Sequence, residues 1–182
     1  AVDSQYQYRD PAGAIGKKED LEGNTPIILN SQQQAIADDF CGRYDSGIRE
    51  TALIHGITGS GKTEVYMEII SHIQKMGREA IVLIPEISLT YQTVMRFYRR
   101  FGNKVSFINS KMSAGERFDQ FERAKKGEIS IMVGPRSALF TPFPDLGLII
   151  IDEEHEAAYK SELSPRYHAR EAAAFRAKQS GA

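Results

Sequence analysis

The sequence predicts an α/β fold in which a mostly parallel sheet carries helices on both faces. Apolar runs of strand length alternate with segments of helical periodicity from residue 51 onward. Two of those runs, 80–84 and 147–151, are apolar throughout, which is typical of parallel strands buried on both faces. Alternation of this kind gives a sheet with helices packed on each side of it.

The elements are expected in the following order. Residues 1–25 are polar and lack a sustained period, so they are expected to form a linker or N-terminal extension, with one domain over 26–182. Asn30 is a good N-cap, and Gln33 stands at the capping-box spacing, so a helix begins there. Further helices are expected at 62–76, 89–101, 113–126 and 168–178, and strands at 51–55, 80–84, 105–108, 129–133 and 147–151.

Composition bounds the class of protein. The formal net charge of −1 gives no overall attraction to nucleic acid or to an anionic membrane, although Lys and Arg outnumber Asp and Glu between Arg96 and Arg136. The single cysteine, Cys41, rules out a disulfide and a cysteine-rich zinc site within this chain. The sequence shows neither a signal peptide nor an apolar run of bilayer-spanning length, so we expect no membrane partner and a cytoplasmic location.

A phosphate-binding loop is predicted between the first strand and the second helix. Gly56, four further residues and then Gly61-Lys62-Thr63 fit the pattern G-x-x-x-x-G-K-[ST]. Glycines let backbone N–H groups turn toward a polyphosphate, and the start of the helix adds unpaired donors. Lys62 can reach the β- and γ-phosphates, and the Thr63 hydroxyl can ligate Mg²⁺. The alternative is a glycine-rich turn with a chance Lys-Thr. The predicted ATP-binding residues of the loop are Gly56, Thr58, Gly59, Ser60, Gly61, Lys62 and Thr63.

Acidic residues at the end of the last apolar run predict the second half of the ATP site. Asp152, Glu153 and Glu154 follow residues 147–151, at the strand end where open α/β sheets bind their ligands. Asp152 is predicted to hold the Mg²⁺ and Glu153 to activate the attacking water, so that Lys62, Asp152 and Glu153 form the catalytic set. The alternative is a solvated acidic turn.

Gln33 has two interpretations that the sequence leaves open. It is either the reciprocal partner of the Asn30 cap or a side chain that faces the adenine edge beside the phosphate loop.

With these residues in place, the chain resembles the first motor lobe of superfamily-two helicases, and more narrowly the PriA family of replication-restart DNA helicases. The resemblance covers about residues 26–180 and rests on motifs in order. These are the glutamine segment 29–33, the phosphate loop with its Glu-Val-Tyr tail at 58–66, motif Ia at 84–90, motif Ib at 136–144, the DEEH form of motif II at 152–155, and an aromatic-rich loop at 159–170. It implies a RecA-like P-loop NTPase lobe that uses ATP and Mg²⁺.

The resemblance also implies residues that grip single-stranded DNA. Thr90, Arg136 and Ser137 match the motifs that hold the DNA backbone, and Tyr159, Arg166 and Tyr167 have the composition of a base-stacking platform. The alternative is that the aromatic residues are core and the cations face solvent. Pro135 departs from the family, which usually has a threonine there, and removes one phosphate donor.

The function implied is an ATP-dependent motor that restarts replication at stalled forks. In the intact enzyme its partners would be single-stranded or forked DNA, the primosome and single-strand-binding proteins. The chain is expected to be truncated before the strand that carries the Ser-Ala-Thr motif III, and to lack the second lobe with its arginine finger. It is therefore expected to bind nucleotide weakly and to hydrolyse ATP slowly by itself. The rivals are an RNA helicase or restriction translocase lobe, and a nucleic-acid- or partner-binding module with a vestigial ATP site.

Overall fold

A computed structural model describes residues 28–57 and 59–182 of the chain. The expected linker at 1–25 and the loop residue Thr58 lie outside the described residues. No helix in the described part has both the length and the apolar character that crossing a membrane demands.

The centre of the fold is a four-stranded sheet in the order β2-β3-β1-β4, and every pair in it is parallel. The strands are β1 (Glu79–Leu83), β2 (Val105–Phe107), β3 (Ile131–Gly134) and β4 (Leu146–Ile151). Their bounds differ by one or two residues from the expected ones. The predicted α/β class with a parallel sheet is confirmed.

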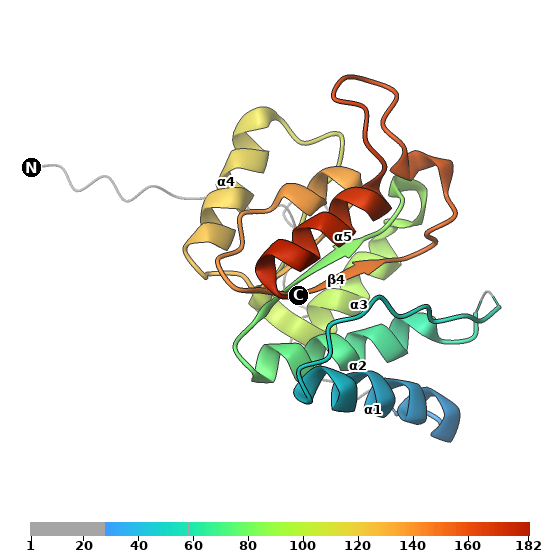
Figure 1. Ribbon diagram of the computed structural model, residues 1–182. Coiled ribbons are helices and arrows are strands. Elements are labelled where there is room, and N and C mark those ends of the chain that lie inside the picture. The colour runs from blue at the N-terminus through green and yellow to red at the C-terminus, as the bar shows by residue number, and fades with distance from the viewer. Residues whose placement is uncertain (1–27, 58) are drawn as a thin grey trace, which may run out of the picture.

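Five α-helices of the described residues pack on the sheet, with α1 to α3 on one side and α4 and α5 on the other (Figure 1). Short 3-10 helices follow several strands. The α-helices are α1 (Ser31–Asp45), α2 (Lys62–Lys75), α3 (Tyr91–Phe101), α4 (Ala114–Lys125) and α5 (Ala169–Ser180), and the 3-10 helices are η3 (Glu86–Ser88), η4 (Gly102–Lys104), η5 (Arg136–Phe140) and η6 (Ala157–Tyr159).

Local capping sets where the helices begin, as predicted. The Asn30 side chain accepts from the backbone of Gln32 and Gln33, and the Gln33 side chain returns to the Asn30 N–H. Ser113 and Glu116 form the same reciprocal pair before α4. Each cap satisfies donors that the first turn leaves free, and contributes about 1 kcal/mol to stability.

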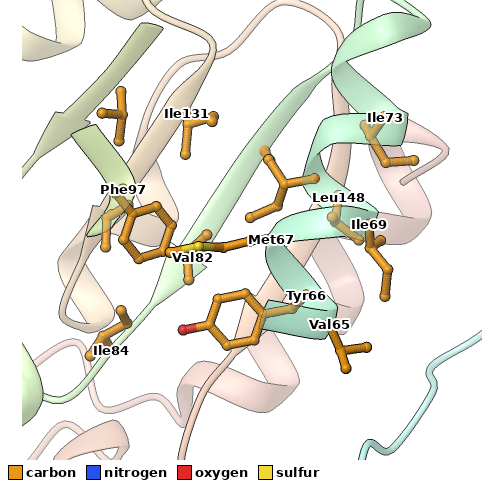
Figure 2. Close-up of a cluster of buried hydrophobic side chains, with 14 of the residues drawn as sticks. Val65, Tyr66, Met67, Ile69, Ile73, Val82, Ile84, Phe97, Ile131 and Leu148 are labelled. Atoms are coloured by element: carbon orange, nitrogen blue, oxygen red, sulfur yellow. The ribbon is translucent and has the colours of Figure 1, made fainter. Parts of the chain in front are cut away.

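Alternate residues of β1 serve two separate cores. Ala80 and Val82 face the α1–α3 side, whereas Ile81 and Leu83 face the α4–α5 side. Figure 2 shows the first core, where side chains of α2 and α3 pack against Val82 of β1. All five residues of β1 are buried, and the four that follow Glu79 are apolar, as expected of a parallel strand covered on both faces.

The strand expected at residues 51–55 is absent, and this prediction is wrong. Residues 51–57 form no strand, and Leu53 and Ile57 are 76% and 82% exposed. A strand needs a hydrogen-bonded neighbour, and residues 51–57 pair with none of the four strands of the described sheet, which ends at β2 on one edge and β4 on the other. The apolar residues 149–151 of β4, an edge strand of the described sheet, are only half-buried.

Candidate functional site

Most predicted site residues lie at one edge of the sheet. Because β1, β3 and β4 are parallel, their last residues, Leu83, Gly134 and Ile151, meet at the same edge. The segments carrying η3, η5 and the acidic residues Asp152 and Glu153 follow these three strands directly. This is the edge at which open α/β sheets bind their ligands.

The described residues of the phosphate loop lead into the amino end of α2. Gly61 is the N-cap of α2 with φ 82°, a left-handed conformation suited to glycine, and a Cβ there would collide with Gln33 Nε2. The Lys62 ammonium donates to the carbonyl oxygens of Gly56 (2.7 Å) and Ile57 (3.0 Å). The Lys62 ammonium therefore lies against two carbonyl oxygens of the loop, close to the amino end of α2, and helix ends of this kind bind anions.

Gln33 contacts the cap and the loop together. Its Oε1 accepts from the Asn30 N–H at 2.9 Å, and its Nε2 donates to the Ser60 carbonyl at 3.0 Å. The predicted cap is confirmed, and the same side chain ties α1 to the phosphate loop.

Asp152 is bonded to the phosphate-loop helix. The Tyr66 hydroxyl, in the second turn of α2, donates to Asp152 Oδ2 at 3.0 Å. The other carboxylate oxygen, Oδ1, accepts from the backbone N–H of Glu153 at 3.0 Å, and the Asp152 N–H donates to the Leu83 carbonyl at 2.9 Å. The carboxylate is therefore held by both oxygens and joined to the helix that begins at Lys62.

Tyr66 belongs to the site although it is not among the site residues predicted from the sequence. Its side chain is 4% exposed, and burial raises its pKa, with the Asp152 carboxylate as the next cause. A hydrogen bond with the Thr63 side chain acts in the opposite direction and lowers that pKa. The hydroxyl therefore lies close to Thr63 and to Asp152, the two side chains predicted to ligate magnesium. Its position in the Glu-Val-Tyr tail of the loop motif is the only sequence feature that marks it.

Glu153 adopts an uncommon backbone conformation. Its φ is 49°, the only positive value among the non-glycine residues that the structure describes. For a residue with a side chain such a conformation costs on the order of 1 kcal/mol. The Glu153 carboxylate accepts a 2.8 Å hydrogen bond from the Ser88 hydroxyl of η3. Ser88 is a second residue of the site that is not among those predicted from the sequence.

The residues predicted to contact the DNA backbone differ in exposure and in their hydrogen bonds. Thr90 is exposed and caps α3 by accepting from the Thr93 N–H. Ser137 is half-buried in η5. The side chain of Arg136 forms hydrogen bonds within the chain: its Nη1 donates to the carbonyl oxygens of Ala158 and Lys160, both at 2.8 Å. This arginine links η5 to the segment after Asp152.

The aromatic-rich loop divides into buried and accessible side chains. Arg166 is exposed, and Tyr167 is half-buried with its ring edge-on to that of Phe140, at 5.4 Å between centroids. Burial raises the pKa of Tyr167, and the nearby Arg136 opposes the shift.

The prediction that Tyr159 stacks on bases is wrong. Its side chain is 1% exposed, and its hydroxyl lies 2.6 Å from the Asp152 carbonyl and 3.0 Å from the Leu83 carbonyl. A ring this deeply buried offers no face to a base. The Tyr159 hydroxyl instead bonds to the backbone of Leu83, at the end of β1, and of Asp152, just after β4.

The donor set fits a nucleotide-bound magnesium ion. Magnesium is usually held by one or two carboxylates and the phosphates of its substrate, with waters in the remaining positions. Asp152 would supply the carboxylate and Thr63 the hydroxyl, and the side chain of Tyr66 interacts with both residues.

The chain matches known proteins over nearly its whole length. The family model described as "Type III restriction enzyme, res subunit" matches residues 26–178. The chain is 46% identical over 170 residues, 93% of its length, to the replication restart protein PriA of Bacillus subtilis (strain 168), covering 21% of that protein. It is 40% identical over 181 residues, 99% of its length, to the PriA of Chlamydia trachomatis serovar D, covering 22% of it.

A third relative matches over fewer residues but at higher identity. The chain is 51% identical over 126 residues, 69% of its length, to the PriA of Synechocystis sp., covering 15% of that protein. The chain thus spans about a fifth of the length of the curated relatives it matches. The matched region contains the phosphate loop and the acidic residues after β4 that the structure joins through Tyr66. The chain therefore belongs to the helicase family whose model is described as the type III restriction enzyme res subunit, as a RecA-like lobe similar to the first motor lobe of PriA.

Proposed function

We propose that this chain is the ATP-binding motor lobe of an ATP-dependent DNA helicase that restarts replication at stalled forks. The observation that carries the proposal is the 3.0 Å hydrogen bond from Tyr66 to Asp152. It joins the helix of the phosphate loop to the acid after β4, so that one bound nucleotide can contact both. Identity of 40–51% to replication restart proteins supports the biological role.

In this proposal the loop residues Gly56 to Thr63 bind the triphosphate of ATP. Backbone N–H groups around Gly59, Ser60 and Gly61 donate to phosphate oxygens, and the Lys62 ammonium pairs with the β- and γ-phosphates. Gln33 lies against the loop at Ser60, a position that supports a role beside the adenine. Magnesium, when bound, neutralises charge that builds on the transferred phosphoryl group, and Thr63 and Asp152 are its protein ligands.

Glu153 is the proposed general base. It stands next to Asp152 and beyond the end of β4, where its carboxylate can orient the attacking water and accept its proton. In the described structure that carboxylate is bonded to Ser88. We propose that DNA bound at the segment with Ser88 and Thr90 changes this bond and thereby couples DNA contact to hydrolysis.

The proposed DNA-binding residues are those with accessible polar groups at the same edge of the sheet. Thr90 and Ser137 suit phosphate oxygens, and Arg166 with Tyr167 suits the cationic and stacking contacts of a single strand. Arg136, bonded to the carbonyl oxygens of Ala158 and Lys160, is better suited to transmitting a change between η5 and the loop after Asp152.

In the intact enzyme this lobe would drive translocation along single-stranded DNA at forks. Primosome and single-strand-binding proteins are its proposed partners there. The isolated chain would bind nucleotide weakly and hydrolyse it slowly, because the charge on the γ-phosphate lacks the stabilising arginine of a second lobe, which can be worth roughly 10³-fold in rate.

The test is ATP hydrolysis with single-stranded DNA, with RNA and with neither. In the intact enzyme we expect stimulation by DNA, and we expect Glu153→Gln to abolish hydrolysis while nucleotide still binds. Stimulation by RNA alone would favour an RNA helicase, and ATP binding without any hydrolysis would favour a binding module. Brisk DNA-stimulated hydrolysis by the isolated chain would contradict the requirement for a second lobe.

A further inference from the structure

We infer that Tyr66 is a positioning residue that orients Asp152 for the nucleotide-bound metal ion. The inference rests on the proposed function, because it concerns how that site holds its metal. It assigns Tyr66 a role that goes beyond packing in the core.

The first step is the geometry around the hydroxyl. Tyr66 comes from the second turn of α2, and Figure 2 shows its ring in the core with the oxygen pointing away from α2. The ring stacks on Phe97 of α3, with 6.4 Å between centroids. Because packing holds the ring, the position of its hydroxyl is fixed, and there it donates a hydrogen bond to Asp152 Oδ2 at 3.0 Å.

The second step is how little freedom the carboxylate retains. Oδ2 is held by Tyr66, and Oδ1 is held by the Glu153 N–H at 3.0 Å. Each carboxylate oxygen has a further lone pair available for a metal or for a metal-bound water. Hydrogen bonds from outside the coordination sphere orient metal ligands, and their loss typically costs roughly 10- to 100-fold in metal affinity or activity.

The third step separates positioning from plain burial. A buried tyrosine hydroxyl needs a partner, and a backbone carbonyl would suffice, as it does for Tyr159. Tyr66 instead donates to the carboxylate predicted to face the metal, and its hydroxyl also lies close to Thr63. The hydroxyl therefore lies beside both predicted protein ligands of the metal, which burial alone does not require.

The test compares Tyr66→Phe with wild type in the 182-residue chain. Binding of the non-hydrolysable analogue AMP-PNP is followed through the amide resonances of residues 59–62, with excess Mg²⁺ and again with EDTA. The measured quantity is the factor by which Mg²⁺ tightens binding. We expect Tyr66→Phe to reduce that factor about ten-fold and to leave the affinity in EDTA unchanged.

Tyr44→Phe is the matched control. Tyr44 is 3% exposed, and its hydroxyl accepts a hydrogen bond from Arg78. Arg78 follows the carboxyl end of α2, whereas the phosphate loop precedes its amino end. This variant also removes a buried hydroxyl, so it should lower thermal stability while the Mg²⁺ factor stays at the wild-type value. A Tyr66→Phe variant that changes only stability, as Tyr44→Phe does, would overturn the inference.

Asp152→Asn tests the same bond from its other partner. The amide oxygen can still accept from Tyr66, but a neutral amide is a poor magnesium ligand, so we expect the Mg²⁺ factor to fall while stability is kept. In that background Tyr66→Phe should have no further effect on the factor, and an additive effect would overturn the inference. A wild-type chain that binds no AMP-PNP under either condition would instead overturn the proposed function.

Discussion

The hydroxyl of Ser88 donates a 2.8 Å hydrogen bond to the carboxylate of Glu153. Ser88 ends η3 after β1, and Glu153 follows β4 with a φ of 49°. The bond therefore joins the segment before Thr90, a proposed DNA contact, to the proposed general base. A base held by a neighbouring hydroxyl is constrained in where its carboxylate can point, so release of this bond would alter hydrolysis.

Ser88→Ala is predicted to weaken the dependence of ATP hydrolysis on DNA in the intact enzyme. Without the hydroxyl, the Glu153 carboxylate is free before DNA arrives, so the rate without DNA should rise several-fold and the ratio of the two rates should fall. The measurement is steady-state ATPase with and without single-stranded DNA. Ser71→Ala is the control, because Ser71 contacts Arg100 instead. An unchanged ratio in Ser88→Ala would exclude this route of coupling.

Tyr159→Phe is predicted to lower the free energy of unfolding of the chain by about 1–2 kcal/mol, because the carbonyl oxygens of Leu83 and Asp152 lose a buried donor. Urea denaturation measures the change. Tyr91→Phe, an exposed tyrosine on α3, should be nearly neutral. Equal stability of the two variants would mean that the hydroxyl of Tyr159 has no structural role.

Tyr167→Ala and Arg166→Ala are predicted to weaken DNA stimulation of ATP hydrolysis more than nucleotide affinity. Arg166 is exposed and Tyr167 is half-buried, and both follow the acidic residues 152–154 in the chain. We therefore expect them to contact DNA and not ATP. Removing a stacking platform typically costs roughly 1–3 kcal/mol per base. Fluorescence anisotropy of labelled single-stranded DNA and ATPase assays report the two effects. Wild-type stimulation in both variants would refute a DNA contact here.

The thiol of Cys41 is predicted to ionise only at high pH. Burial, followed by the charges of Asp45, Asp38 and Glu68, raises its pKa from 9.0 to about 11. The rate of alkylation by iodoacetamide should therefore keep rising to about pH 11 in the folded chain, and level off near pH 9 in urea. A plateau near pH 9 in the folded chain would contradict the shift.

The same shift predicts a pH dependence of stability. Because the folded state favours the neutral thiol, Cys41 stabilises the fold below about pH 9, and that contribution is lost as pH rises toward 11. Cys41→Ser should flatten this part of the stability profile, measured by thermal unfolding between pH 8 and 11.

Local and periodic features could be predicted from the sequence. The reciprocal caps at Asn30 and Ser113 involve residues three apart, so their chemistry is visible in a short window. The run that became β1 is buried on both faces, and its composition reflects that directly. The helix that follows the phosphate loop also contacts Asp152, through the hydroxyl of Tyr66, as a shared ATP site would require.

Features that depend on distant partners could not be predicted. Residues 51–55 have the composition of a strand, but a strand forms only beside a hydrogen-bonding neighbour. The aromatic residues of the loop after Asp152 look alike in sequence, and only the packing separates buried Tyr159 from half-buried Tyr167. The partners of Tyr66 and Ser88 lie 86 and 65 residues away, and no local pattern marks such pairs.

The most direct test places a paramagnetic ion in the site. Mn²⁺ takes the place of Mg²⁺ with AMP-PNP, and line broadening is measured for the backbone amides of the chain. If one metal-bound nucleotide contacts both Thr63 and Asp152, the amides of residues 59–63 and of 152–153 should broaden together, and Lys62→Ala should reduce both effects. Broadening of the loop amides with sharp resonances at Asp152 and Glu153 would contradict a shared site.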